Sequence, residues 1–305
     1  MTSTLRSPAS GATPAPAPTT PAPRVRPGAV GLFVALAYGL GWLVALPLWL
    51  GDGLREPFVP LISTAMMTTP TIAALVVVLL VMRTRHPARF LGLVVRRPLR
   101  TAAYALVGAI GAPLLVLCAL LIGTAAGVTS ITVAPGLLST LLMLPVLTAV
   151  IGVAAIGEEI GWRGFLQTAL RPLGTWPALL ITGAVWGLWH APLVLLGYNY
   201  GTTDPLALVA MTFATVPLGV LVGWLRMRTG SIWAGALTHG AINAATSLAL
   251  VALVAPADQD PATTLLGWTG ALLIAAVVAV LVAARVLRWT EPVQDVAREA
   301  VAIGR

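Results

Sequence analysis

Long apolar runs, each about as long as a membrane span, constrain this chain more than any other feature. Of its 305 residues, 58% are hydrophobic and 9% are charged, whereas a soluble domain carries roughly 25% charged residues. Each run has about 20 residues, which is enough for a helix to cross the core of a bilayer. Backbone groups in lipid must be satisfied internally, and the short alternating segments of a membrane barrel are not visible. The sequence therefore predicts an all-α, polytopic bundle of transmembrane helices.

Eight spans are predicted from these runs, and the placement of arginine supports the count. The spans cover residues 29–50, 58–82, 101–123, 137–157, 177–197, 206–225, 231–254 and 264–287. With the N-terminus inside, 17 of the 18 Arg residues fall in cytoplasmic tails and loops, Arg163 and Arg171 among them, and only Arg55 falls outside. This asymmetry follows the positive-inside rule and predicts that both termini are cytoplasmic.

Composition divides the chain into four predicted segments. Residues 1–28 are rich in Pro, Ala and Thr and are expected to be a disordered tail. Residues 29–136 hold the first transmembrane helices, 137–254 form a core with the polar residues of the spans, and 255–305 hold the last span and a cytoplasmic tail. The net charge of +8 lies in short loops beside spans. It therefore indicates a lipid bilayer as partner, in a multi-pass cell-membrane protein, and does not indicate nucleic acid.

Small residues within the spans predict where helices pack closely, and the chain has one cysteine. Gly183 and Gly187 form one stripe at four-residue spacing, and Ala236 and Gly240 belong to another. Such stripes let helix backbones approach closely in lipid. The one cysteine, Cys118, excludes an intramolecular disulfide and is expected to be a buried, unreactive thiol.

Five polar or ionisable residues stand out because they lie within or directly beside apolar spans. They are Glu158 and Glu159 at the end of the fourth span, His190 in the fifth, and His239 with Asn243 in the seventh. A charged group inside a bilayer costs about 2.5–3.5 kcal/mol or more and normally faces the bundle interior. One shared polar pocket explains all five residues more economically than five separate defects.

Helical spacing refines this prediction. Glu159 and Arg163 are four residues apart, so the two side chains can pair on one face. His239 and Asn243 have the same spacing, and Trp186 shares a helix face with His190. Each of three helices is therefore expected to turn one polar edge toward the pocket.

Two kinds of chemistry suit these residues. A glutamate can act as general base on a water molecule, a histidine can pass the proton to a leaving amine, and a second histidine with an amide can stabilise an oxyanion. Alternatively, Glu158, His190 and His239 could bind Zn²⁺ with water as fourth ligand. The residue pattern leaves both open.

Three short motifs on separate spans resemble one family. "EEIGWR" is similar to the EExxxR motif of the CPBP family, the type II CAAX prenyl endopeptidases and their Abi relatives. "WGLWH" resembles its FxxxH motif and "HGAIN" its HxxxN motif, over roughly residues 137–250. Trp186 departs from the pattern because phenylalanine is commoner there.

The resemblance implies a site and an activity. Glu158 matches the catalytic base, His190 its partner, and His239 with Asn243 the oxyanion-stabilising pair. Glu159 and Arg163 match residues that would organise the pocket. The implied protein is an intramembrane endopeptidase of the glutamic type, with no cofactor, that cleaves a membrane-associated protein or peptide.

Two other functions remain open from the sequence. A catalytically silent scaffold or immunity protein could use the same pocket to bind a partner. A proton-coupled transporter is the weakest alternative, because the polar residues occupy only the second half of the chain and transporters commonly show two related halves. The arginine-only, alanine-rich composition suggests a bacterial cytoplasmic membrane.

Overall fold

The computed structural model of the chain describes residues 26–254 and 265–289, and within these ranges it is helical. The predicted tail over 1–28 lies outside the described residues except for its last three, of which Pro27 and Gly28 begin the first helix. The predicted tail that follows the last span also lies outside from residue 290 onward. A lone antiparallel bridge between Ile131 and Val254 is the β-pairing recorded among the described residues.

The helices follow the predicted spans closely. The long ones are α1 (Pro27–Leu50), α2 (Val59–Leu75), α4 (Pro98–Ala125), α5 (Leu137–Glu159), α7 (Thr175–Trp189), α9 (Leu206–Thr229), α10 (Trp233–Leu253) and α11 (Trp268–Ala283). Short helices α3 (Pro87–Phe90), α6 (Gln167–Leu170) and α8 (Ala191–Val194) lie between them. A π-helical turn over Val76–Val81 extends α2 to the predicted length of the second span.

Seven helical segments among the described residues are long and apolar enough to cross a membrane. The eighth predicted span corresponds to α11, which has 16 residues and is shorter than the roughly 20 that a full crossing needs. The described part of the chain is thus all-helical, and its long apolar helices are those of a multi-pass membrane protein. The side of the membrane on which each end lies stays a prediction.

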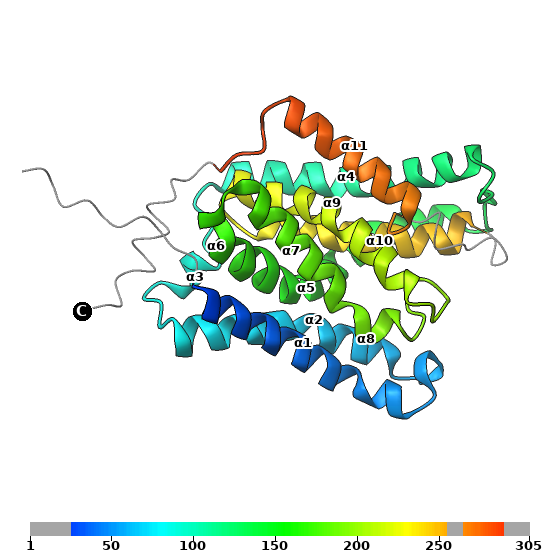
Figure 1. The fold of residues 1–305 in the computed structure, drawn as a ribbon. Coiled ribbons are helices and arrows are strands. Elements are labelled where there is room, and N and C mark those ends of the chain that lie inside the picture. Colours follow the sequence, from blue (N-terminus) through cyan, green and yellow to red (C-terminus); the bar gives the residue numbers. More distant parts are fainter. Residues whose placement is uncertain (1–25, 255–264, 290–305) are drawn as a thin grey trace, which may run out of the picture.

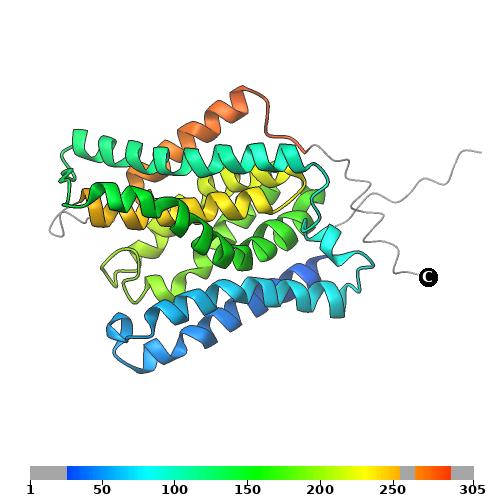
Figure 2. The ribbon, with the colours of Figure 1, turned by 180° about the vertical axis from the view of Figure 1, so that it is seen from behind.

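The bundle has three parts that both views of the ribbon show. Helices α1 and α2 lie side by side along one edge, α4 and α11 lie along the opposite edge, and α5, α7, α9 and α10 fill the space between them (Figures 1 and 2). In this arrangement α10 packs against both α5 and α4, and α7 packs against α9. The helices that carry the conspicuous polar residues are therefore central.

Glycines at helix crossings allow this close packing, as the small-residue stripes predict. A Cβ on Gly240 of α10 would lie 2.5 Å from the Cα of Gly152 in α5. A Cβ on Gly183 would lie 2.8 Å from the Cα of Val216 in α9, and one on Gly187 would lie 2.6 Å from the Cα of Thr212. The α5–α10 and α7–α9 pairs therefore meet backbone to backbone.

The predicted end of the fourth span at residue 157 is wrong. Helix α5 continues through a π-helical turn (Ile160–Leu166), α6 and a 3₁₀ turn (Arg171–Leu173), so the helical segment runs from Leu137 to Leu173. Arg163 and Arg171, expected in a cytoplasmic loop, are buried within it. A hydropathy profile places the end of a span at these residues because it contains no information on the buried partners that compensate their charges.

The prediction for Cys118 is also wrong in one respect. Its side chain is exposed on the outer surface of α4, so in a membrane it would contact lipid and not the protein interior. The error arises because a uniformly apolar helix gives no signal for which face packs against its neighbours.

Candidate active site

A helical hairpin brings the glutamate motif and the first histidine to the same depth. The 37-residue segment Leu137–Leu173 turns at Gly174 into α7, and Gly174 has a φ of +103°, a conformation that favours glycine. Glu158 precedes Gly174 by as many residues as His190 follows it. Because the two helices run antiparallel from one turn with the same rise per residue, Glu158 and His190 lie side by side along the bundle.

Glu158 is buried and accepts hydrogen bonds from two tryptophans. Nε1 of Trp186 donates to its Oε2 over 2.6 Å, and Nε1 of Trp162 donates to the same atom over 3.3 Å. Trp162 lies one turn further along the same helix, whereas Trp186 reaches across from α7. These indoles hold the carboxylate in one orientation and leave Oε1 without a hydrogen bond from any described residue.

Glu159 points to a different set of partners. Its Oε1 accepts from Nη1 of Arg163 over 2.7 Å and lies 3.0 Å from Nδ1 of His239 on α10. Both members of the Glu159–Arg163 pair have fully buried side chains. The predicted pairing of these two residues is confirmed. The contact between the second glutamate and His239 was not predicted.

A glycine of α10 provides the space that this buried carboxylate occupies. A Cβ on Gly235 would lie 3.1 Å from Oε2 of Glu159, so a residue without a side chain stands where α10 passes the carboxylate. Oε2 of Glu159, together with Nε and Nη2 of Arg163, makes no hydrogen bond to a described residue. These three polar atoms keep hydrogen-bonding capacity in the interior of the bundle.

His190 lies directly after α7 and is half-buried. Its Nδ1 is 2.9 Å from the backbone oxygen of Trp186. A carbonyl oxygen can only accept, so Nδ1 carries the proton and Nε2 is the nitrogen left for chemistry. The His190 ring is a neighbour of Trp186, which in turn binds Glu158, so His190 borders the same polar region.

Trp186 is the residue that links the members of the site. The guanidinium carbon of Arg163 lies 4.2 Å from the centroid of its ring system. The rings of His239 and His190 lie 5.2 Å and 5.9 Å from it, centroid to centroid. Together with its hydrogen bond to Glu158, these contacts make one indole the common neighbour of two histidines, an arginine and a glutamate.

Asn243 is less closely integrated than the other predicted site residues. It lies one turn after His239 on α10 and is half-buried, and its side chain makes no hydrogen bond to a residue that the structure describes. Its predicted role as an oxyanion donor therefore rests on its position one turn from His239 and stays a prediction.

The zinc alternative can be examined from the ligand geometry. Over residues 26–254 and 265–289, no three His, Cys, Asp or Glu side chains are close enough together to hold a metal ion. Glu158 is bound by indole N–H groups, and His239 faces Glu159. In this arrangement Glu158, His190 and His239 do not form a zinc site.

Trp162 is the functional neighbour that the sequence analysis did not assign, whereas Trp186 was expected beside His190 but without its bond to Glu158. Trp162 could have been found from its four-residue spacing after Glu158, which puts both side chains on one helix face. The bond from Trp186 to Glu158 joins two helices, and no spacing rule within either helix predicts it. An indole N–H is a donor only, so it can bind a carboxylate without competing for the proton of a water molecule.

The fold and this site define a class of protein: a helical membrane protein with a buried glutamate–histidine–tryptophan centre. Residues 138–245 match the family described as "Type II CAAX prenyl endopeptidase Rce1-like". The matched region contains every predicted site residue, from Glu158 to Asn243. The chain is thus similar to this family over 108 of its 305 residues.

One curated protein is similar to part of this chain. The chain is 29% identical over 96 residues to "CAAX prenyl protease 2" of Methanococcus maripaludis. The alignment covers 30% of this chain and 35% of that protein, so the chain spans about a third of the relative's length. The likeness is that of a distant homologue over part of each chain.

Proposed function

We propose that this protein is an intramembrane endopeptidase that hydrolyses a peptide bond of a membrane-associated protein or peptide. The observation that carries the proposal is the convergence of Glu158, His190 and His239 around Trp186 in the interior of the bundle. Three ionisable groups on three helices are costly to bury unless they act together. The family match over the same helices supports a hydrolytic role for them.

Glu158 is the proposed general base. Both indoles bind Oε2, so Oε1 is the oxygen that takes a proton from water as the water oxygen attacks the peptide carbonyl carbon. The two N–H donors hold the carboxylate in one orientation. A base fixed in one orientation reduces the ordering that the transition state requires.

His190 is the proposed partner for the proton. Its Nδ1–H is tied to the backbone oxygen of Trp186, which leaves Nε2 to orient the water or to share the proton that Glu158 accepts. As the tetrahedral intermediate collapses, that proton passes to the amide nitrogen and the C–N bond breaks. The products are a carboxylate and an amine, and no covalent enzyme intermediate is needed.

The oxyanion of the intermediate is assigned to His239 and Asn243. The Glu159 carboxylate, 3.0 Å from Nδ1, fixes the orientation of the His239 ring and leaves Nε2 as the ring nitrogen that would face the oxyanion. Nε and Nη2 of Arg163 make no hydrogen bond to a described residue and add positive charge nearby. Asn243 would contribute an amide N–H from the next turn of α10.

A cleavage assay tests the proposal. The purified full chain in proteoliposomes is incubated with a library of membrane-anchored peptides, and new termini are detected by mass spectrometry. Glu158→Gln should lower cleavage by about 10²–10⁴-fold, the usual contribution of a general base. Glu56→Gln, at a half-buried position between α1 and α2, is the matched control and should cleave like the unaltered chain.

Three outcomes would contradict the proposal. If no peptide is cleaved while Glu158→Gln still supports the cellular role of the protein, the pocket serves a scaffold that binds a partner. If a strong chelator abolishes cleavage and zinc restores it, the reaction depends on a metal ion and the glutamate is not sufficient as base. Equal cleavage by both variants would exclude Glu158 from the reaction.

A further inference from the structure

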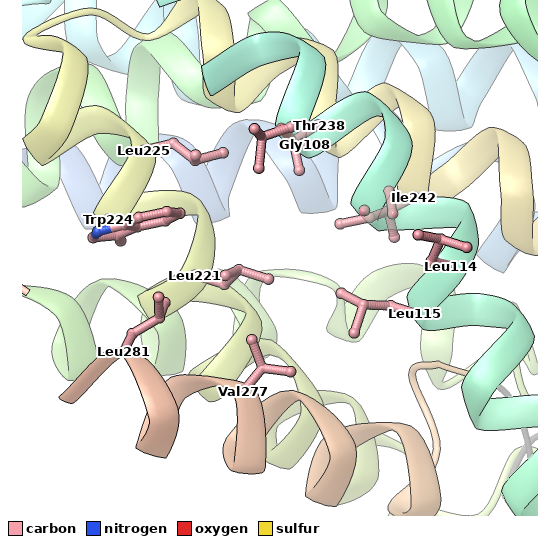
Figure 3. A pocket seen from close by; sticks show the side chains of 13 residues that line it. Gly108, Leu114, Leu115, Leu221, Trp224, Leu225, Thr238, Ile242, Val277 and Leu281 are labelled. Carbon is pink, nitrogen blue, oxygen red and sulfur yellow. The ribbon is translucent and has the colours of Figure 1, made fainter. Parts of the chain in front are cut away.

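A second cavity lies on the far side of α10 from the site. It has a volume of about 370 Å³ and is bordered by α4, α9, α10 and α11, within the range of small-molecule pockets. Its lining is almost wholly apolar, and Figure 3 shows leucines from α4, α9 and α11 facing one another across it. Trp224 of α9 lies at one end of this groove and Leu114 of α4 at the other (Figure 3).

A basic and aromatic cluster continues the groove beyond Trp224. The rings of Trp224 and Tyr104 meet edge to face at 5.4 Å between centroids. Nε of Arg228 donates to the Tyr104 hydroxyl over 3.0 Å. The guanidinium carbons of Arg100 and Arg228 lie 5.8 Å and 5.9 Å from the Tyr104 ring centroid.

The two arginines and the apolar groove are therefore arranged one after the other along the bundle. Arg100 lies in the first turn of α4 and Arg228 in the last turn of α9, at the arginine-rich end of the bundle that the sequence predicts to be cytoplasmic. The groove runs from there toward the middle of the spans. Nε1 of Trp224, at the junction, is buried and makes no hydrogen bond to a described residue.

We propose that this groove binds one anionic phospholipid. An acyl chain lies between α4, α9, α10 and α11, and the phosphate is held by Arg100 and Arg228. The complementarity has two parts, because a chain of methylene groups suits a leucine-lined groove and a phosphate suits two guanidinium groups. Basic pockets between transmembrane helices at the cytoplasmic surface are a recurrent kind of lipid site.

Two glycines of α4 define where the groove is closed and where it is open. A Cβ on Gly108 would clash with Thr238 of α10, so the helices touch there. A Cβ on Gly111, one turn further, would meet no heavy atom within 4 Å, and Gly111 lines the groove. A large side chain at Gly111 can therefore fill the groove without displacing the protein around it.

Native mass spectrometry of the purified full chain tests the proposal. The protein is equilibrated with equal amounts of phosphatidylglycerol and phosphatidylcholine, and the lipids retained by the chain are counted. The unaltered chain should retain one phosphatidylglycerol in preference to phosphatidylcholine. Gly111→Leu should lose that lipid, whereas Gly39→Leu, in the middle of α1 and also in open space, should keep it.

Arginine variants test the headgroup separately. Arg100→Gln and Arg228→Gln should each lower the preference for the anionic lipid by about fivefold, as expected for one basic residue near an anionic headgroup. Arg97→Gln, exposed at the same end of the bundle, is the charge-matched control and should leave the preference unchanged. A thermal unfolding curve for each variant shows that the chain is still folded.

Three results would overturn the proposal. Retention of as much phosphatidylglycerol by Gly111→Leu as by Gly39→Leu would place the lipid elsewhere. Equal retention of both lipids by the unaltered chain would show that the arginines do not select an anionic headgroup. An equal loss of preference in Arg97→Gln would show diffuse surface charge in place of a built site. The assay does not depend on peptide cleavage, so it stands or fails independently of the proposed function.

Discussion

The two faces of α10 meet opposite environments although consecutive residues supply them. His239 faces the buried carboxylate of Glu159, whereas Thr238, one residue earlier, lines the apolar groove beside Gly108. A helix turns by about 100° per residue, so neighbours in sequence can serve separate sites. On the polar face each side chain depends on a specific hydrogen-bonding or charged partner, whereas on the apolar face the side chains need mainly to fit in size. Substitutions that remove a polar partner are therefore expected to cost more than substitutions that keep the size of an apolar side chain.

The largest expected difference is between two neighbouring residues of α10. His239→Gln removes the proposed oxyanion donor and its contact with Glu159, and it should lower peptide cleavage by about 10²–10³-fold. Thr238→Val keeps the size of the side chain on the groove face and should leave cleavage close to that of the unaltered chain. The measurement is the rate of peptide cleavage in proteoliposomes; similar losses in both variants would mean that α10 is merely sensitive to change.

The buried ion pair of the polar face should dominate stability. Arg163→Met leaves the Glu159 carboxylate without its closest cation in a fully buried position, so the free energy of unfolding should fall by about 3–5 kcal/mol. Unfolding by a denaturing detergent, followed by circular dichroism, gives this quantity.

An exposed ion pair serves as the control for Arg163. The Arg55–Asp52 pair has side chains that are 85% and 79% exposed, so Arg55→Met should change the free energy of unfolding by about 0–1 kcal/mol. If both arginine variants unfold alike, burial does not set the strength of the Arg163–Glu159 pair.

A substitution at the backbone contact of α10 should give the next largest change in the free energy of unfolding. Gly240→Ala adds a Cβ that would lie 2.5 Å from the Cα of Gly152, so α5 and α10 must separate, at a cost of about 1–3 kcal/mol. Gly39→Ala in α1 adds the same group in open space and should be neutral or slightly stabilising because alanine favours helix. The same unfolding measurement compares the two; a neutral Gly240→Ala would show that the helices do not need this close approach.

The smallest expected effect concerns the hydrogen bond that joins two helices at Glu158. Trp186→Phe removes the indole donor but keeps an aromatic ring, so cleavage should fall by about tenfold, corresponding to one hydrogen bond to a charged group. Trp176→Phe, exposed near the start of α7, should have no effect. A lower turnover number with an unchanged KM would indicate that Trp186 positions the base; a change in KM alone would assign it to substrate binding.

Much of the fold follows from local sequence. Apolar runs predicted seven of the membrane-length helices, and the stripe containing Gly240 correctly predicted close helix contact. The boundary after residue 157 was wrong because Arg163 and Arg171 resemble loop residues in a hydropathy profile. Their burial depends on partners, Glu159 for the first and the ring of Trp289, 4.2 Å away, for the second. Such compensation is a property of the packed bundle.

Spacing and motif resemblance selected the residues of the candidate site, but they did not predict most of the contacts among them. Spacing predicted that Glu159 pairs with Arg163, and motif resemblance pointed to Glu158, His190 and His239. Neither showed that His239 contacts the second glutamate, nor that two indoles bind the first. These contacts depend on the rotation of α7 and α10 against the continuous helix, which involves residues far apart in the chain.

By itself, the sequence of this protein determined that it spans a membrane, which residues are polar within the spans, and which motifs they form. Hydropathy and helical period are sums over neighbouring residues, so they can be evaluated without knowing the fold. Only the tertiary structure decided that Glu158 and His190 lie at one depth, that Trp186 stands between the charged groups, and that α10 separates a polar site from an apolar groove. Those features arise from the distances between helices, and the backbone contacts at a few glycines set these distances.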